Sequence, residues 1–286
     1  MNPYSIIYSP NLKFFNFMTP ELLHSLFKSI APIVDGIKIP NLMISIYGQK
    51  IKEFISYFEN KILIFDTQIS CPILNYDTEK EYGIDLEYLD TIKFFTESYN
   101  LTYVTFNGLF DINTLSTYIE YCNHLEFKSL LTTFESPFFY NYKIGTSKEE
   151  RVQIKHNLDM IVTQPLKLYE SLFYVGESTG VDGFICPINN KEILHFCRRF
   201  STKIISSSDY NLWQDPKLLY DWASQVGKNS FYISELQGTD PILIQNYLKN
   251  LVSLRNATLL ESFNGYQWKQ EGESKKSILN WRNTDN

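Results

Sequence analysis

Two short apolar runs, each carrying a charged residue near its end, decide the fold: VDGIKIP at residues 34–40 and ILIFD at residues 62–66. Short runs rich in isoleucine and other large apolar residues are typical of buried strands. A longer segment with helical spacing follows each run. A buried strand followed by a helix is the repeating unit of parallel α/β folds, so the two runs predict neighbouring parallel strands.

The same unit recurs along the rest of the chain. Eight short runs predict strands, at Ser5–Tyr8, Val34–Ile39, Ile62–Asp66, Tyr103–Phe106, Ser129–Thr133, Gly183–Cys186, Lys203–Ser206 and Phe231–Ser234. Each run precedes a candidate helix. Eight strand–helix units over about 250 residues favour an α/β fold of the (β/α)₈ TIM-barrel type over a doubly wound parallel sheet.

Capping signals predict where several helices begin. The first signal is Thr19-Pro20-Glu21, in which a capping hydroxyl precedes a proline at the first helical position; this helix is expected to end near Pro32. Comparable starts are expected at Asp111, Asp215-Pro216 and Asp240-Pro241.

The spacing of the units predicts one barrel domain over residues 1–263. An enlarged connection over residues 135–163 separates the fifth and sixth strands, and a polar tail over residues 264–286 is expected to be loosely ordered. The connection could be a lid over the barrel, although an ordinary surface insertion is the more common role of such a segment.

Composition excludes several classes of protein. The 286 residues are 44% hydrophobic and 20% charged, which is enough apolar material for a large core. A formal net charge of −6 offers no electrostatic footprint for nucleic acid or for an anionic membrane surface. Neither partner is therefore expected.

The sequence also predicts a cytoplasmic protein without cofactor or metal. The four cysteines form no CxxC pair, and no long uncharged apolar run or secretory signal is present. P-loop, GxGxxG, HExxH and GxSxG patterns are absent as well.

The charged residues of the two opening runs are the first candidates for a site. Functional groups of (β/α)₈ barrels gather at the carboxyl ends of the strands. Lys38 and Asp66 stand near the ends of adjacent predicted strands, so we expect them to form an ion pair at the barrel mouth. Such a pair can be a reactive centre or a purely structural contact.

The ordered set of strand motifs resembles the orotidine 5′-phosphate decarboxylase family. VDGIKIP (34–40) is similar to its second strand, and ILIFDTQISCPI (62–73) to its third-strand Asp-x-Lys-x-x-Asp signature. YVTFNG (103–108), LLTTFESP (130–137) and VDGFICP (181–187) are similar to the next strands, and residues 223–241 to the last strand and its phosphate loop. The resemblance implies a lyase barrel of pyrimidine biosynthesis that binds a nucleotide and forms dimers.

The departures from that family are concentrated in its catalytic groups. By the resemblance, Lys38 matches the second-strand lysine and Asp66 matches the first aspartate of the signature. The lysine that protonates the carbon left by carbon dioxide falls on Gln68, and the aspartate supplied across the dimer interface falls on Cys71. The ribose-binding aspartate of the first strand falls near Ser9.

The phosphate-binding segments differ too. Ser207 and Ser208 occupy the place of the family's glycine-rich turn, and Glu235 stands where the family has a phosphate-binding arginine. An anion at that position repels phosphate. Asn107, at the end of the fourth strand, completes the candidate ligand-binding residues with Ser9, Ser207, Ser208 and Glu235.

Three functional hypotheses follow. The leading one is a pseudoenzyme, a decarboxylase-like barrel that has lost catalysis and binds a ligand or a protein partner as a homodimer or paired with a related barrel. The second is a repurposed enzyme in which Lys38 and Asp66 form an acid/base pair, with Gln68 and Ser9 as positioning groups. The third is a divergent active orotidine 5′-phosphate decarboxylase, which requires a lysine beside Asp66 from elsewhere in the fold.

Overall fold

A computed structural model describes residues 4–10, 18–66, 102–107, 112–132, 165–186, 204–206, 222, 230–236 and 240–270. Structural statements below refer to these residues. The expected enlarged connection at 135–163 lies outside them, as do residues 271–286.

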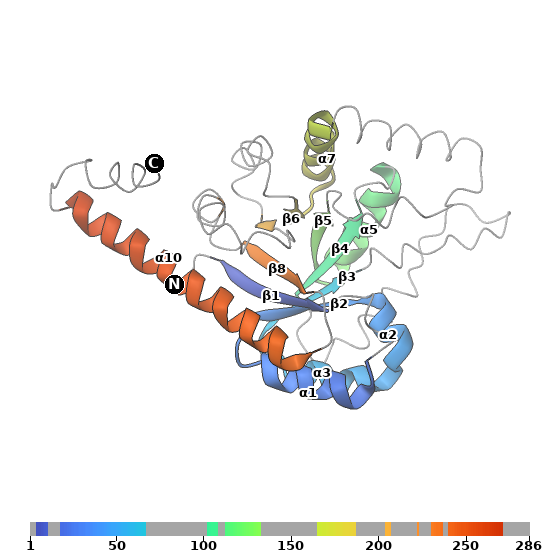
Figure 1. Ribbon diagram of the computed structural model, residues 1–286. Helices are drawn as coiled ribbons and strands as arrows, with labels where there is room; N and C mark the ends of the chain where they lie inside the picture. Colours follow the sequence, from blue (N-terminus) through green and yellow to red (C-terminus); the bar gives the residue numbers. More distant parts are fainter. Residues whose placement is uncertain are drawn as a thin grey trace.

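The core of the fold is one parallel sheet of eight strands (Figure 1). The strands are β1 (Ser5–Pro10), β2 (Gly36–Pro40), β3 (Ile62–Asp66), β4 (Tyr103–Asn107), β5 (Lys128–Thr132), β6 (Gly183–Ile185), β7 (Ile204–Ser206) and β8 (Phe231–Leu236). Their order is β7-β6-β5-β4-β3-β2-β1-β8, and the two end strands, β7 and β8, contact each other. The sheet therefore curls into a barrel, and all eight predicted strands are confirmed with small shifts of their ends.

Helices cover the outside of this sheet (Figure 1). They are α1 (Pro20–Ile30), α2 (Asn41–Tyr47), the short 3₁₀ helix η2 (Gly48–Lys50), α3 (Ile51–Ser56), α5 (Ile112–His124), α7 (Pro165–Thr179) and α10 (Pro241–Gln270). Helix α1 packs against α3 and α10.

The capping signals are confirmed where the structure describes them. The Thr19 hydroxyl accepts the backbone N–H of Leu22 at 3.3 Å, and Pro20 is the first residue of α1. The Asp240 carboxylate accepts the N–H of Ile242 at 2.9 Å, at the start of α10. Each cap satisfies a backbone donor that has no partner within the helix. Asp111 and Asp215 lie outside the described residues, although α5 begins at Ile112.

Two apolar layers follow from the alternation of side chains along each strand. The larger layer lies between the sheet and the helices and includes Leu26 and Phe27 of α1 with Phe65 of β3. The smaller layer fills the barrel interior, and its buried members are Ile7, Ile64, Tyr103, Leu130, Ile185, Phe231 and Ile233. Fully burying one such side chain stabilises the fold by about 1.5–3 kcal/mol.

Gly36 is required by close packing inside the barrel. A Cβ atom at this position would collide with the Ile62 carbonyl oxygen and lie 2.8 Å from the Cδ1 atom of Ile7. The opposing backbone cannot move without disturbing the β2–β3 ladder, in which Gly36 pairs with Ile62. Glycine at the start of β2 therefore lets the neighbouring strand approach.

The amino ends of two strand pairs are held by the same Val-Asp-Gly motif. Asp35, directly before β2, donates its N–H to the Ile6 carbonyl at 2.9 Å and accepts the Ile6 N–H on its carboxylate at 2.8 Å. Asp182, directly before β6, does the same with the carbonyl and N–H of Ser129, at 3.0 and 2.8 Å. The β1–β2 and β5–β6 pairs are thus joined by matching contacts on the two halves of the barrel.

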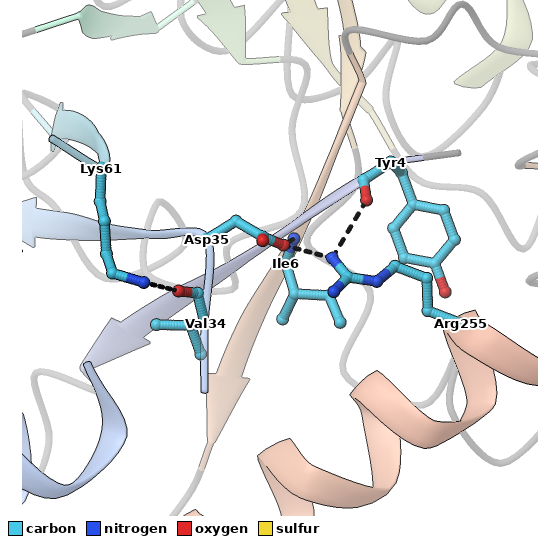
Figure 2. A network of polar contacts seen from close by, with 6 residues as sticks. All are labelled: Tyr4, Ile6, Val34, Asp35, Lys61 and Arg255. Carbon is cyan, nitrogen blue, oxygen red and sulfur yellow. Dashed lines mark hydrogen bonds and ion pairs between the residues drawn. The ribbon is translucent and has the colours of Figure 1, made fainter. Parts of the chain in front are cut away.

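Helix α10 is anchored to the same end of the barrel through Arg255 (Figure 2). Its guanidinium donates to the Tyr4 carbonyl oxygen at 3.3 Å and forms an ion pair with Asp35. Arg255 is buried, whereas the Asp35 side chain keeps 30% of its surface exposed. The contact joins the last described helix to the first two strands.

The predicted start of the C-terminal tail falls inside α10. The helix continues past Phe263 to Gln270, so residues 264–270 are helical. At a rise of about 1.5 Å per residue, the part after Arg255 extends the helix by about 22 Å. The single-domain division at residue 263 otherwise stays a prediction.

Candidate functional site at the carboxyl ends of the strands

Buried polar side chains in the middle or carboxyl-terminal half of adjacent strands include Ser9, Lys38, Asp66 and Thr105. They come from β1, β2, β3 and β4 in turn. Each stands two positions after a residue that packs inside the barrel, and strand side chains alternate between faces. All four therefore belong to the interior face of the barrel, and active sites of such barrels are built at its carboxyl-terminal end.

Lys38 and Asp66 form the expected ion pair. The Lys38 Nζ atom lies 2.8 Å from the Asp66 Oδ2 atom, and the two side chains expose only 4% and 8% of their surface. The Thr105 hydroxyl donates to the other carboxylate oxygen, Oδ1, at 2.9 Å. Three successive strands thus each contribute one side chain to a single charge centre.

Strand register explains why these side chains meet. Lys38 pairs in register with Ile64, and Asp66 pairs with Thr105 on the next strand. The long lysine side chain spans the offset between its own position and the carboxylate. The arrangement therefore follows from backbone pairing and needs no loop to hold it.

Burial makes this pair costly to build. Removing each ion from water costs several kcal/mol, and attraction between the charges offsets this only when the geometry is good and further hydrogen bonds are present. The 2.8 Å ion pair and the Thr105 hydrogen bond supply both conditions. Replacing a buried ion pair by apolar residues of similar volume often leaves stability unchanged or raises it, so a buried pair is weak evidence of a role in stability.

The apolar interior of the barrel lies beneath the charge centre. Ile64 and Ile7 precede Asp66 and Ser9 by two positions on their strands, and both are fully buried. Nearer the amino ends, the rings of Tyr103 and Phe231 meet edge to face, with their centroids 4.9 Å apart. The charges are therefore shielded from water on this side, which strengthens electrostatic interactions within the site.

The other predicted site residues are placed only in part. Asn107 is the last residue of β4, paired in register with Thr132, and Glu235 is paired with Ser9 between β8 and β1. The backbone of both thus reaches the same end of the barrel as the ion pair. Gln68, Cys71, Ser207 and Ser208 lie outside the described residues, so their roles stay predictions.

Sequence reasoning missed Thr105. The fourth predicted strand contains no charged residue, and the candidate predicted from it is Asn107, directly after its end. The alternation of side chains along a strand was the available signal, because Thr105 stands two positions after Tyr103 and takes the same face of the strand.

Two further titratable side chains in the described part of the chain, His24 and Cys122, fit structural roles. The His24 ring nitrogen Nε2 hydrogen-bonds the Tyr57 hydroxyl at 2.8 Å between α1 and the turn that follows α3. Burial raises the pKa of Cys122 to about 12, with the nearby charge of Asp182 adding to the effect, so this thiol is unreactive near neutral pH. Among the described residues, no group of three or more histidine, cysteine, aspartate or glutamate side chains is placed to hold a metal ion.

The helices that the structure describes are not membrane spans. None of them combines the length and the apolar character that crossing a bilayer demands.

Sequence comparison identifies no relatives. No protein-family model matches the chain, and no curated protein matches it significantly. The fold, by contrast, is found in many solved structures.

Three of these structures cover nearly the whole chain. Orotidine 5′-monophosphate decarboxylase from Methanocaldococcus jannaschii, complexed with the inhibitor BMP, is 13% identical with a TM-score of 0.57, over 88% of this chain and 99% of that one. For 3-hexulose-6-phosphate synthase from Salmonella typhimurium the identity is 12%, the TM-score 0.51 and the coverage 88% and 99%. KGPDC from Streptococcus mutans is 11% identical with a TM-score of 0.51, over 89% of this chain and 98% of that one.

Identities this low show a shared fold and carry no activity from one protein to another. The similarity extends over most of this chain and almost all of each matched one, in agreement with the eight parallel strands described above. The chain therefore has the α/β barrel fold of orotidine 5′-monophosphate decarboxylase and the structures similar to it.

Proposed function

We propose that this protein is a pseudoenzyme, a ligand-binding barrel that retains the charge pair of a decarboxylase-like site but does not decarboxylate. The observation that carries the proposal is the buried Lys38–Asp66 pair at the carboxyl ends of β2 and β3. A buried ion pair at the place where barrels bind ligands is better explained by a polar ligand than by stability.

The proposed loss of decarboxylation rests on the lysine that the sequence resemblance does not find in this chain. By the sequence resemblance, Gln68 takes the place of the lysine that protonates the carbanion, and a glutamine amide cannot donate that proton. Among the described strands, Lys38 is the one lysine near a carboxyl end, since Lys128 begins β5. Losing an electrostatic contributor of this kind typically costs about 3–4 kcal/mol of transition-state stabilisation.

The proposed ligand is a pyrimidine nucleotide or a compound of similar size and polarity. The structural neighbour from Methanocaldococcus jannaschii is complexed with the inhibitor BMP, which makes a nucleotide-like ligand the first to test. A phosphate group is expected to lower its affinity, because in the resemblance Glu235 replaces the phosphate-binding arginine, so binding is expected to depend on the base and the ribose.

A dimer belongs to the same proposal. The resemblance implies pairing of two barrels, either two copies of this chain or this chain and a related one. Light scattering on the purified protein tests the homodimer: a mass near twice 33.6 kDa is expected, and a mass of one chain would exclude it.

Loss of catalysis is tested by incubating the purified protein with orotidine 5′-monophosphate and following decarboxylation. We expect no turnover above that of a buffer control. Turnover by the wild-type protein that disappears in an Asp66→Ala variant would overturn the proposal and establish a divergent decarboxylase.

One observation favours a second candidate, a repurposed enzyme. The Lys38 Nζ and Asp66 Oδ2 atoms lie 2.8 Å apart in nearly buried side chains, and an amine and a carboxylate are groups that serve as general acid and base. Such a pair can act as acid and base on a substrate other than orotidine 5′-monophosphate. A screen of phosphorylated sugars and keto acids for products that require both residues would distinguish this enzyme from the pseudoenzyme.

A further inference from the structure

The Asp66 carboxylate is held by two different strands. Its Oδ2 atom meets the ammonium of Lys38 on β2, at 2.8 Å, and its Oδ1 atom accepts the hydroxyl of Thr105 on β4, at 2.9 Å. Lys38, Asp66 and Thr105 are all buried, and Thr105 has no exposed surface at all. The carboxylate therefore has a separate donor on each oxygen.

A buried threonine hydroxyl at this end of the barrel can find a hydrogen-bond acceptor other than a carboxylate. Thr132, also buried and near the carboxyl end of the next strand, donates its hydroxyl to the backbone carbonyl of Phe106 at 2.7 Å. The two threonines thus have the same side chain, similar burial and a partner on the preceding strand. They differ in that Thr105 binds the charged group of the site and Thr132 binds backbone.

The orientation of an aspartate carboxylate is weakly fixed by its own torsion. Rotation about χ2 of aspartate has broad, roughly two-fold minima, so the planar group needs an outside contact to hold one angle. A hydrogen bond to Oδ1 from a fixed strand position supplies that contact. It sets the direction in which Oδ2 faces the Lys38 ammonium.

We propose that Thr105 is a positioning residue of the ligand site: its hydroxyl orients the Asp66 carboxylate and thereby fixes the Lys38 ammonium with which the ligand interacts. The part of this inference that concerns ligand binding rests on the proposed function. The positioning itself is a property of the unliganded protein. Binding sites lose affinity when supporting hydrogen bonds are removed, because the contacting groups are then no longer held in place.

Three variants separate positioning from a general structural role. Thr105→Val removes the hydroxyl at nearly constant volume, Thr105→Ser restores it, and Thr132→Val removes a matched hydroxyl outside the charge centre. Urea denaturation of all three shows whether they fold. We expect both valine variants to fold and Thr105→Val to be destabilised more than Thr132→Val, because the lost hydrogen bond of Thr105 is to a charged carboxylate and that of Thr132 is to a neutral carbonyl.

Calorimetric titration with uridine monophosphate gives the binding readout. We expect Thr105→Val to weaken binding about tenfold or more, which corresponds to about 1.4 kcal/mol. Thr105→Ser and Thr132→Val are expected to stay within about threefold of the wild-type protein. Equal losses in the two valine variants, or no loss in Thr105→Val, would overturn the proposal.

A ligand-independent measurement keeps this inference separate from the proposed function. The side-chain ammonium of Lys38 is followed by nitrogen-15 NMR in the unliganded protein, with its signal assigned by its disappearance in Lys38→Met. Thr105→Val should shift or broaden this signal, and Thr132→Val should leave it unchanged. An unchanged signal in Thr105→Val would overturn the positioning role even if the wild-type protein binds no nucleotide.

Discussion

At the scale of single residues, two charge contacts hold opposite ends of the barrel. Lys38 and Asp66 pair near the carboxyl ends of the strands, and Arg255 pairs with Asp35 at the amino ends. The first contact is almost fully buried, whereas Asp35 remains partly exposed. Breaking a buried ion pair lowers the free energy of unfolding more than breaking an exposed one. Mutations in the two contacts are therefore expected to differ in how much stability they remove.

The first prediction concerns Asp66. Asp66→Asn leaves the Lys38 ammonium buried without its counter-charge, so the free energy of unfolding should fall by about 3–5 kcal/mol. The double variant Lys38→Met/Asp66→Leu removes both charges and should be as stable as the wild-type protein or more so. Urea denaturation measures both. A double variant that is less stable than Asp66→Asn would contradict a pair kept for binding and indicate a structural role.

The second prediction concerns Arg255. Arg255→Met removes hydrogen bonds to the Tyr4 carbonyl and to the Asp35 carboxylate, and we expect the free energy of unfolding to fall by about 1.5–3 kcal/mol. Nucleotide binding should be unaffected, because this contact lies at the other end of the strands. Urea denaturation and calorimetry on the same preparation test both statements. Loss of binding in a folded Arg255→Met protein would show that the two ends are coupled.

The Lys38–Asp66 pair could be predicted from sequence, but its third member could not. Asp66 ends one apolar run and Lys38 stands two residues before the end of the other, on the neighbouring parallel strand, so the two side chains are expected close together. Thr105 lies inside a strand, and a buried threonine is as often satisfied by backbone, as Thr132 is. Which partner a hydroxyl takes depends on strand register, and no local pattern specifies it.

At the scale of elements, β2 shows how one position controls strand packing. Gly36 lies against the carbonyl of Ile62 and the side chain of Ile7, so the neighbouring strands approach without an intervening Cβ atom. Two residues later the same strand presents Lys38 to the site. Displacing the start of β2 would therefore disturb both the barrel interior and the charge centre.

The third prediction is that Gly36→Ala destabilises the protein by about 3 kcal/mol, at the upper end of the range for overpacked cores. Ile7→Val removes the Cδ1 atom near the new methyl group, yet it should not rescue the variant, because the Ile62 carbonyl still collides with it. Thermal or urea denaturation of the single and double variants decides between these outcomes. Rescue by Ile7→Val would mean that the side chain, and not the backbone, limits the approach.

Strands were more predictable than the ends of helices. The eight apolar runs are short, separated by polar segments and flanked by turn residues, so each has one plausible structure. Helix α10 instead continues past Asn264 and Gly265, a pair typical of helix ends, and reaches Gln270. Nothing in that local sequence distinguishes a stop from a continuation.

At the scale of the whole molecule, the barrel determines where a ligand can bind but not what happens to it. The described strands place Ser9, Lys38, Asp66 and Thr105 on one interior surface at their carboxyl ends. The barrel fold could be predicted from the number and order of strand–helix units, and the structural similarities agree with it. Function depends on side chains that follow the strands, and a fold shared at 13% identity does not fix them.

The central claim, binding without decarboxylation, is tested most directly by calorimetric titration with uridine monophosphate and its 6-hydroxy analogue, which mimics the carbanionic intermediate of the decarboxylase family. An active decarboxylase stabilises that charge and binds such an analogue at least about a hundredfold more tightly. We predict that this protein binds both compounds, with affinities within about threefold of each other. A strong preference for the analogue would contradict the pseudoenzyme, and the absence of binding by either compound would contradict a nucleotide-binding site.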